Sequence, residues 1–233
     1  MGSGKRYLLQ GETYFISLLG HDGNICFFDD ACYDRYLTQL TQCLGAFQVQ
    51  LHSFVLLPNE IHLLMTSATP TGIPGLMKLV SDAYVRYYNN RFERSGTIWK
   101  GKFKSSLIKG NDLVLECQKY IELAPVRAGL VSFPGEYWWS AFCINAFGGH
   151  GAGVTMHDQY RNFGKHSPNR FQHYRNFIAK TSSETEQHLF EHRLSAGFPL
   201  AMQVYGARRV KAVKRCHLHS GLPSRVTEVR AIA

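Results

Sequence analysis

No run of apolar residues in this sequence approaches the roughly 20 that a helix needs to cross a membrane, so we expect no membrane partner. The first residues lack the apolar core of a secretory signal peptide. No two of the six cysteines have the two-residue gap of a zinc knuckle or a redox motif. Scattered cysteines are typical of buried thiols in a reducing compartment. We therefore expect a cytoplasmic protein.

Acidic residues are also scarce, with 17 Asp and Glu against 26 Lys and Arg, which gives a formal net charge of +9. A basic protein is suited to a polyanion, because each bound phosphate releases condensed counterions. A basic but unliganded surface explains the total equally well, so the local clustering of charges has to decide. Hydrophobic residues make up 45% of the 233 residues, which favours a globular core over disorder.

The spacing of apolar residues predicts the order β-α-β-β-α-β, followed by one more helix. The expected strands are 13–19, 47–57, 60–66 and 97–108, and the expected helices are about 30–44, 73–93 and 111–124. This order is that of a ferredoxin-like split βαβ unit. We predict an α+β fold in which an antiparallel sheet carries its helices on one face.

A glycine-rich stretch at 148–153 divides the chain in composition. We expect one domain over residues 1–147 and a basic, mostly helical extension over residues 148–233. Beyond Arg193 the extension has many basic residues and Glu228 as its only acid. Such a tail is suited to follow a phosphate backbone.

Glu60 and His62 are the first candidate functional residues. Because strand side chains alternate between faces, both point to the same side of the strand 60–66. A carboxylate and an imidazole on a rigid sheet can begin a divalent-metal site. Two polar side chains on a solvated face are the alternative, because two ligands alone do not make a metal site.

The segment 94–110 has no acid and is rich in lysine. If it is one strand, its lysines share one face and its aromatic residues share the other. The lysines would then suit a phosphate backbone and the aromatics would suit stacked bases. A solvated basic face over a buried aromatic face is the alternative. The residues concerned are Trp99, Lys100, Lys102, Phe103 and Lys104.

Four segments resemble motifs of one known family, in the same order along the chain. Residues 55–64 (VLLPNEIHLL) are similar to its strand that ends in Pro-Asn-His-hydrophobic-His, and residues 97–106 (TIWKGKFKSS) to its Trp-x-Gly-basic stretch. Residues 120–130 (YIELAPVRAGL) resemble its Tyr-Ile-x-Leu-Asn-Pro-Val-Arg-Ala-Gly signature, and YWWS at 137–140 resembles its aromatic-Trp-Ser element. Residues 7–142 thus resemble the REP-associated tyrosine transposases, which are IS200-like, single-tyrosine HUH transposases.

The resemblance implies an activity and its residues. Tyr120 would attack a phosphodiester of single-stranded hairpin DNA and keep the 5′ phosphate in a covalent link. Mg²⁺ or Mn²⁺, held by Glu60 and His62, would polarise that phosphate. The protein would act as a monomer or a homodimer, since relatives of both kinds exist. The expected DNA contacts are Arg86, Arg91, Trp99, Lys100, Lys102, Lys104, Arg127, Arg208, Arg209 and Lys211.

Two positions depart from the family pattern. Glu60 stands where the family has its first histidine ligand, and a carboxylate there favours Mg²⁺ or Mn²⁺. Ala124 stands where the family has an asparagine or glutamine ligand, and alanine cannot bind a metal. Glu116 lies one turn before Tyr120 on the same helix face, whereas Glu122 points elsewhere.

Three functions remain open at this stage. The first is a metal-dependent transposase that nicks and rejoins DNA, and the second is a descendant that only binds hairpin DNA. The third is an RNA-binding module, because the RRM domain shares the split βαβ order. The basic-Gly-aromatic-Gly-aromatic pattern of that module is not evident around 99–107.

Overall fold

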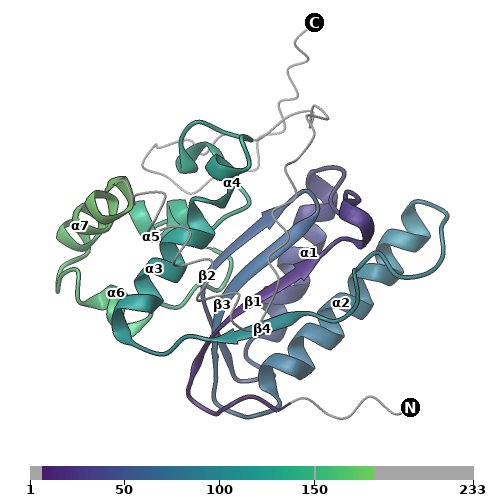
Figure 1. The fold of residues 1–233 in the computed structure, drawn as a ribbon, viewed down its shortest axis with the longest axis horizontal. Coiled ribbons are helices and arrows are strands. Elements are labelled where there is room, and N and C mark those ends of the chain that lie inside the picture. Colours follow the sequence, from purple (N-terminus) through teal and green to yellow (C-terminus); the bar gives the residue numbers. More distant parts are fainter. Residues whose placement is uncertain (1–6, 150, 181–233) are drawn as a thin grey trace, which may run out of the picture.

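The computed structural model describes residues 7–149 and 151–180 (Figure 1). The predicted DNA contacts Arg208, Arg209 and Lys211 lie outside these residues. Within the described ranges, no helix is long and apolar enough to cross a membrane.

An antiparallel sheet of four strands forms the centre of the fold, in the order β2-β3-β1-β4. The strands are β1 (Thr13–Leu19), β2 (Val49–Leu57), β3 (Glu60–Ser67) and β4 (Lys104–Leu107). β2 and β3 form a hairpin around Pro58 and Asn59, as the turn residues predict. The predicted α+β split βαβ fold is confirmed.

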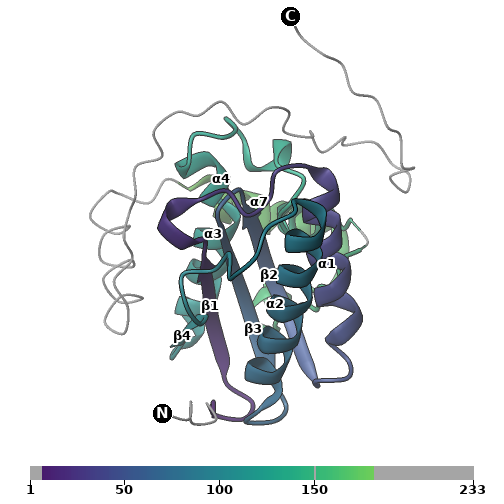
Figure 2. The same cartoon turned by 90° about the vertical axis from the view of Figure 1, so that its right-hand side faces the viewer.

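The two helices of the split unit, α1 (Asp30–Cys43) and α2 (Gly72–Arg91), lie on one face of the sheet, as expected (Figure 2). The Asp29 carboxylate caps α1 by accepting a hydrogen bond from the backbone N–H of Cys32, 3.1 Å away. The third helix, α3 (Asn111–Glu122), covers the opposite face and contacts β2 and β3. The sheet is therefore buried between two helical layers, and the prediction of helices on one face holds for α1 and α2 alone.

The remaining helices extend the layer that contains α3 (Figure 1). They are α4 (Ala124–Arg127), α5 (Phe142–Phe147), α6 (Asp158–Arg161) and α7 (Ser167–Ala179). Two short 3₁₀ turns complete the described elements: η1 (His21–Gly23) lies between β1 and α1, and η2 (Pro134–Glu136) lies between α4 and α5. Phe142, Tyr160 and Tyr174 form a second buried cluster beside α3. Chain beyond the predicted boundary at 147 also returns to the sheet, where Val154 pairs with Leu51. The two-domain division itself stays a prediction.

The prediction of one continuous strand over 97–108 is wrong. Trp99 makes an isolated bridge to Gly20, and the regular strand begins only at Lys104. Gly101 has a φ of 77°, in the left-handed region that interrupts a strand and favours glycine. Lys100 and Lys102 consequently precede β4 and do not share a strand face with Lys104.

Trp99 was also expected to stack on DNA bases, and the structure contradicts this. Its side chain is only 3% exposed and lies among the rings of Phe27, Tyr36 and Tyr84 between the sheet and the helices α1 and α2. A ring enclosed in this way cannot reach a base. Trp99 is a core residue, because it lies on the face of the sheet that α1 and α2 cover, opposite to the face of Lys104.

Candidate active site

The face of the sheet under α3 carries a row of polar side chains. The strand register pairs Ser17 of β1 with His62 of β3 on one side and with Lys104 of β4 on the other. Leu19 pairs with Glu60 in the same way. Directly opposed residues of antiparallel strands point to the same face, so Glu60, His62 and Lys104 all face α3. Of the expected lysine contacts in the described residues, Lys100, Lys102 and Lys104, only Lys104 belongs to this face.

Glu60 and His62 form a close pair. The Glu60 Oε2 atom lies 3.5 Å from the His62 Nε2 atom, and the His62 side chain is 3% exposed while that of Glu60 is 19% exposed. Neither ring nitrogen of His62 has a hydrogen-bond partner among the described residues. A buried imidazole without partners carries a desolvation cost, which a bound cation would offset. The pair therefore fits one side of a divalent-metal site.

The described residues do not complete a metal site from acidic, histidine or cysteine side chains. Within residues 7–149 and 151–180, no group of three such side chains is placed to hold a metal. Glu116, which the helix pattern puts one turn before Tyr120, does not complete a set with Glu60 and His62. Ala124 is buried at the start of α4. Water and phosphate oxygens are suited to serve as further ligands of a metal held by Glu60 and His62.

α3 carries Tyr120 over this pair. The Tyr120 ring is nearly parallel to that of His62, at 18° and with 6.0 Å between centroids. Phe15 of β1 meets the Tyr120 ring edge-on at 6.1 Å. The Tyr120 side chain is half-buried, so its ring packs against the core while part of the side chain remains accessible. The predicted nucleophile and the predicted metal pair are thus brought together.

Arg127 approaches the same tyrosine. Its guanidinium carbon lies 3.9 Å from the centre of the Tyr120 ring. An Nη2 hydrogen is donated to the Tyr120 backbone oxygen, 2.6 Å away. The one-turn helix α4, with Pro125 near its start, folds Arg127 back over α3. The sequence pattern assigned Arg127 to DNA only and did not reveal this contact.

Glu122 lies outside the candidate metal site, as its helix position predicts. Its carboxylate is fully buried and accepts hydrogen bonds from Ser53, Asn145 and Tyr174 at 2.9, 2.7 and 2.7 Å. Burial raises the pKa of this carboxyl to about 7, although these hydrogen bonds act in the opposite direction. Glu122 therefore ties α3 to β2, α5 and α7.

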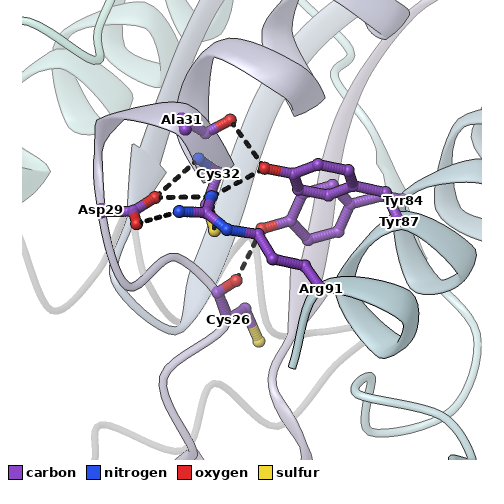
Figure 3. Close-up of polar contacts among 7 residues, drawn as sticks. All are labelled: Cys26, Asp29, Ala31, Cys32, Tyr84, Tyr87 and Arg91. Carbon is purple, nitrogen blue, oxygen red and sulfur yellow. Dashed lines mark hydrogen bonds and ion pairs between the residues drawn. The ribbon is translucent and has the colours of Figure 1, made fainter. Parts of the chain in front are cut away.

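The other expected DNA contacts, Arg86 and Arg91, lie on α2 and hence on the opposite side of the sheet. Arg91 is held by Asp29, with its Nη1 and Nη2 atoms 3.0 and 2.5 Å from the two carboxylate oxygens (Figure 3). Lys100 and Lys102 are exposed on the segment before β4. The structure does not gather all the expected basic residues in one place.

One known protein family matches part of the sequence. The family described as "Transposase IS200 like" matches residues 24–123, a stretch that contains Glu60, His62 and Tyr120. This match to an IS200-like transposase family agrees with the resemblance seen in the motifs. No curated protein matches the sequence.

Among solved structures, one described as a REP-associated tyrosine transposase bound to a REP hairpin is 16% identical, with a TM-score of 0.53. The similarity covers 67% of this chain and 93% of that one, and it shows the shared fold. A putative transposase from Deinococcus radiodurans R1 is 20% identical over 52% of this chain and 96% of that one, with a TM-score of 0.35. A bacterial tRNA(His) guanylyltransferase-like protein in complex with GTP is 10% identical over 55% and 69%, with a TM-score of 0.40.

Proposed function

We propose that this protein nicks and rejoins single-stranded hairpin DNA through a covalent link to Tyr120. The observation that carries the proposal is the position of the Tyr120 ring beside the Glu60–His62 pair. The transposase family match supports the reaction class, and the hairpin in the similar solved structure supports the kind of DNA. That this protein also recognises a hairpin is part of the proposal.

The reaction is an exchange of phosphodiester bonds. The Tyr120 oxygen forms a bond to phosphorus and loses its proton, while the bond from phosphorus to the 3′ oxygen breaks and that oxygen gains a proton. The 5′ phosphate stays on Tyr120, and a 3′ hydroxyl can reverse the exchange and join strands. Because each step trades one phosphodiester bond for another, no nucleotide cofactor is required.

Glu60 and His62 are the residues that would hold Mg²⁺ or Mn²⁺. A metal there would polarise the phosphate and stabilise the charge that develops on its oxygens. The chain itself contributes position and charge. Phe15 and His62 fix the Tyr120 ring by packing, and Lys104 presents a cation on the same face for the phosphate backbone.

A binding-only descendant is the second candidate. It is favoured by Ala124 and by the lack of a third acidic or histidine ligand within the described ranges. Such a protein would use the same surface to bind a hairpin and leave it uncut. The two candidates predict different products from the same substrates.

Incubation with a library of single-stranded hairpins, with and without Mn²⁺, separates them. A covalent adduct that migrates above the free protein on a denaturing gel establishes the nicking activity. Binding without any adduct establishes the second candidate. The Tyr120→Phe variant is the control, since it keeps the ring and removes only the hydroxyl.

A further inference from the structure

A second, positively charged surface lies on the side of the sheet away from Tyr120. It is a shallow hollow of about 550 Å³ on α1 and α2, the helices that cover the face opposite to α3. Its lining residues are Arg35, Ala83, Arg86, Tyr87, Asn90 and Arg91. Because the sheet stands between the two, this hollow cannot be part of the site around Tyr120.

One arginine of the hollow is a fixed part of its wall. Arg91 binds both carboxylate oxygens of Asp29 and donates to the Tyr87 hydroxyl at 2.7 Å (Figure 3). Partial burial acts to raise the pKa of Asp29, but the hydrogen bonds from Arg91 and Cys32, with the charge of Arg91, outweigh it and lower that pKa. The Asp29–Arg91 pair therefore persists near neutral pH. It links the start of α1 to the end of α2.

The other two arginines are available for a ligand. In the described part of the chain, neither Arg35 nor Arg86 makes an ion pair with a carboxylate, and no acidic residue lines the hollow. The Arg35 guanidinium lies 5.6 Å from the Tyr87 ring centre, and that of Arg91 lies 5.9 Å from it. Tyr87 thus holds two guanidinium groups at the same hollow.

These features favour an extended anion over a small molecule. Guanidinium groups bind phosphate oxygens in planar, bidentate geometry. A small-molecule site encloses most of its ligand, whereas this hollow is open along the helices. Asn90 adds a side-chain amide, which can donate a hydrogen bond to a phosphate or sugar oxygen.

We propose that the hollow binds the phosphate backbone of a second segment of DNA, distinct from the segment presented to Tyr120. The inference rests on the proposed function for the identity of the polyanion, and the formal charge of +9 is complementary to it. A bound DNA would then reach both sides of the sheet, so that strands flanking the hairpin add affinity.

The first experiment compares two variants that each lose two positive charges. Arg35→Gln with Arg86→Gln alters the hollow, and Arg161→Gln with Lys165→Gln alters exposed cations near α6. The full-length proteins are titrated with labelled hairpins, with and without long flanking strands, in EDTA and at several salt concentrations. Circular dichroism melting verifies that each variant is folded.

The hollow variant is expected to lose about 10-fold or more in affinity for the long substrate. Its slope of log affinity against log salt should become shallower by roughly 1.4 to 1.8, the contribution of two phosphates. Affinity for the bare hairpin should stay within about 2-fold of wild type. An unchanged slope and affinity for the long substrate, or losses equal to those of the control variant, would overturn the inference.

The second experiment locates the DNA directly. A photocrosslinking amino acid in place of Asn90 is expected to label the flanking strand of the long substrate. A crosslink that forms only within the protein, or only to the hairpin, would overturn the inference. If wild-type protein binds no hairpin at all, the proposed function fails as well. If wild-type protein binds DNA and the hollow variant behaves as wild type, only the second segment is refuted.

Discussion

The Arg127 guanidinium lies 3.9 Å from the centre of the Tyr120 ring and also bonds to the Tyr120 backbone oxygen. This double contact joins the end of α4 to the last turn of α3, the helix that carries the candidate nucleophile. It gives Arg127 a role in positioning that its place in the sequence motif did not reveal. A cation over an aromatic face contributes about 0.5 to 2 kcal/mol, depending on its exposure.

We predict that Arg127→Ala lowers the rate of adduct formation at saturating DNA by about 10- to 100-fold, because a positioned group is lost. A residue that only contacts DNA would instead weaken affinity and leave the rate at saturation unchanged. Quenched-flow measurement of adduct against DNA concentration separates the two effects. Arg161→Ala, at an exposed position of α6, is the matched control.

Tyr120→Phe is predicted to abolish the covalent adduct and to leave hairpin affinity within about 3-fold of wild type. The phenylalanine ring retains the packing against Phe15 and His62. Denaturing gels detect the adduct and anisotropy titration measures the affinity. Persistence of the adduct in this variant would show that another tyrosine attacks, and the assignment of Tyr120 would be wrong.

His62→Ala is predicted to remove metal-dependent cleavage, since it deletes one of two side chains that fit a metal. Ala124→Asn is predicted to raise cleavage by about 10-fold or more, because it adds a ligand group near Tyr120. Calorimetric titration with Mn²⁺ tests the site without DNA or activity, and His62→Ala should lose the heat of binding. If neither the wild type nor the Glu60→His, Ala124→Asn double variant cleaves any hairpin, the nicking function is refuted.

Trp99→Ala is predicted to destabilise the fold by about 3 to 5 kcal/mol, because it leaves a cavity among three aromatic rings. Urea unfolding measures this loss. Trp138→Ala is the control, since Trp138 is exposed and should cost about 0.5 kcal/mol or less. Trp99→Phe should keep DNA affinity at the wild-type level, whereas a base-stacking role would lower it.

The sequence alone predicted those parts of the site whose geometry is set within one strand or one turn. The alternation along β3 places Glu60 and His62 on one face, and the turn at Pro58 fixes the hairpin register. Alternation also puts Trp99 on the face opposite to Lys104, but it does not tell whether that face is buried, and only the core under α1 and α2 shows that it is. The contact between Arg127 and Tyr120 depends on the direction that α4 takes after α3. The spacing of residues in the sequence does not predict that direction.

The buried carboxylate of Glu122 was beyond sequence reasoning for a different reason. On the helix pattern it is an ordinary polar position near the end of α3. Its partners Ser53, Asn145 and Tyr174 come from elements far along the chain, and only the assembled fold brings them together. The residue pattern of one helix cannot reveal a cluster whose other residues come from different helices and strands.

This carboxylate gives the last prediction, a pH dependence of stability. The pKa of Glu122 is raised from 4.5 to about 7 in the fold by burial. Between these values the folded state holds a proton that the unfolded state has released, so stability falls as pH rises from about 4.5 to 7. Glu122→Gln should remove this contribution, on the order of 1 to 3 kcal/mol across the window.

The measurement is urea unfolding of wild type and Glu122→Gln at several pH values, with the difference between them as the readout. The difference is needed because burial lowers the pKa of His52 to about 4, and this destabilises the fold as pH falls below its unfolded value of 6.5. That effect is common to both proteins and cancels. Ser53, Asn145 and Tyr174, which bond to Glu122, do not change protonation in the window, so a flat difference would contradict the raised pKa.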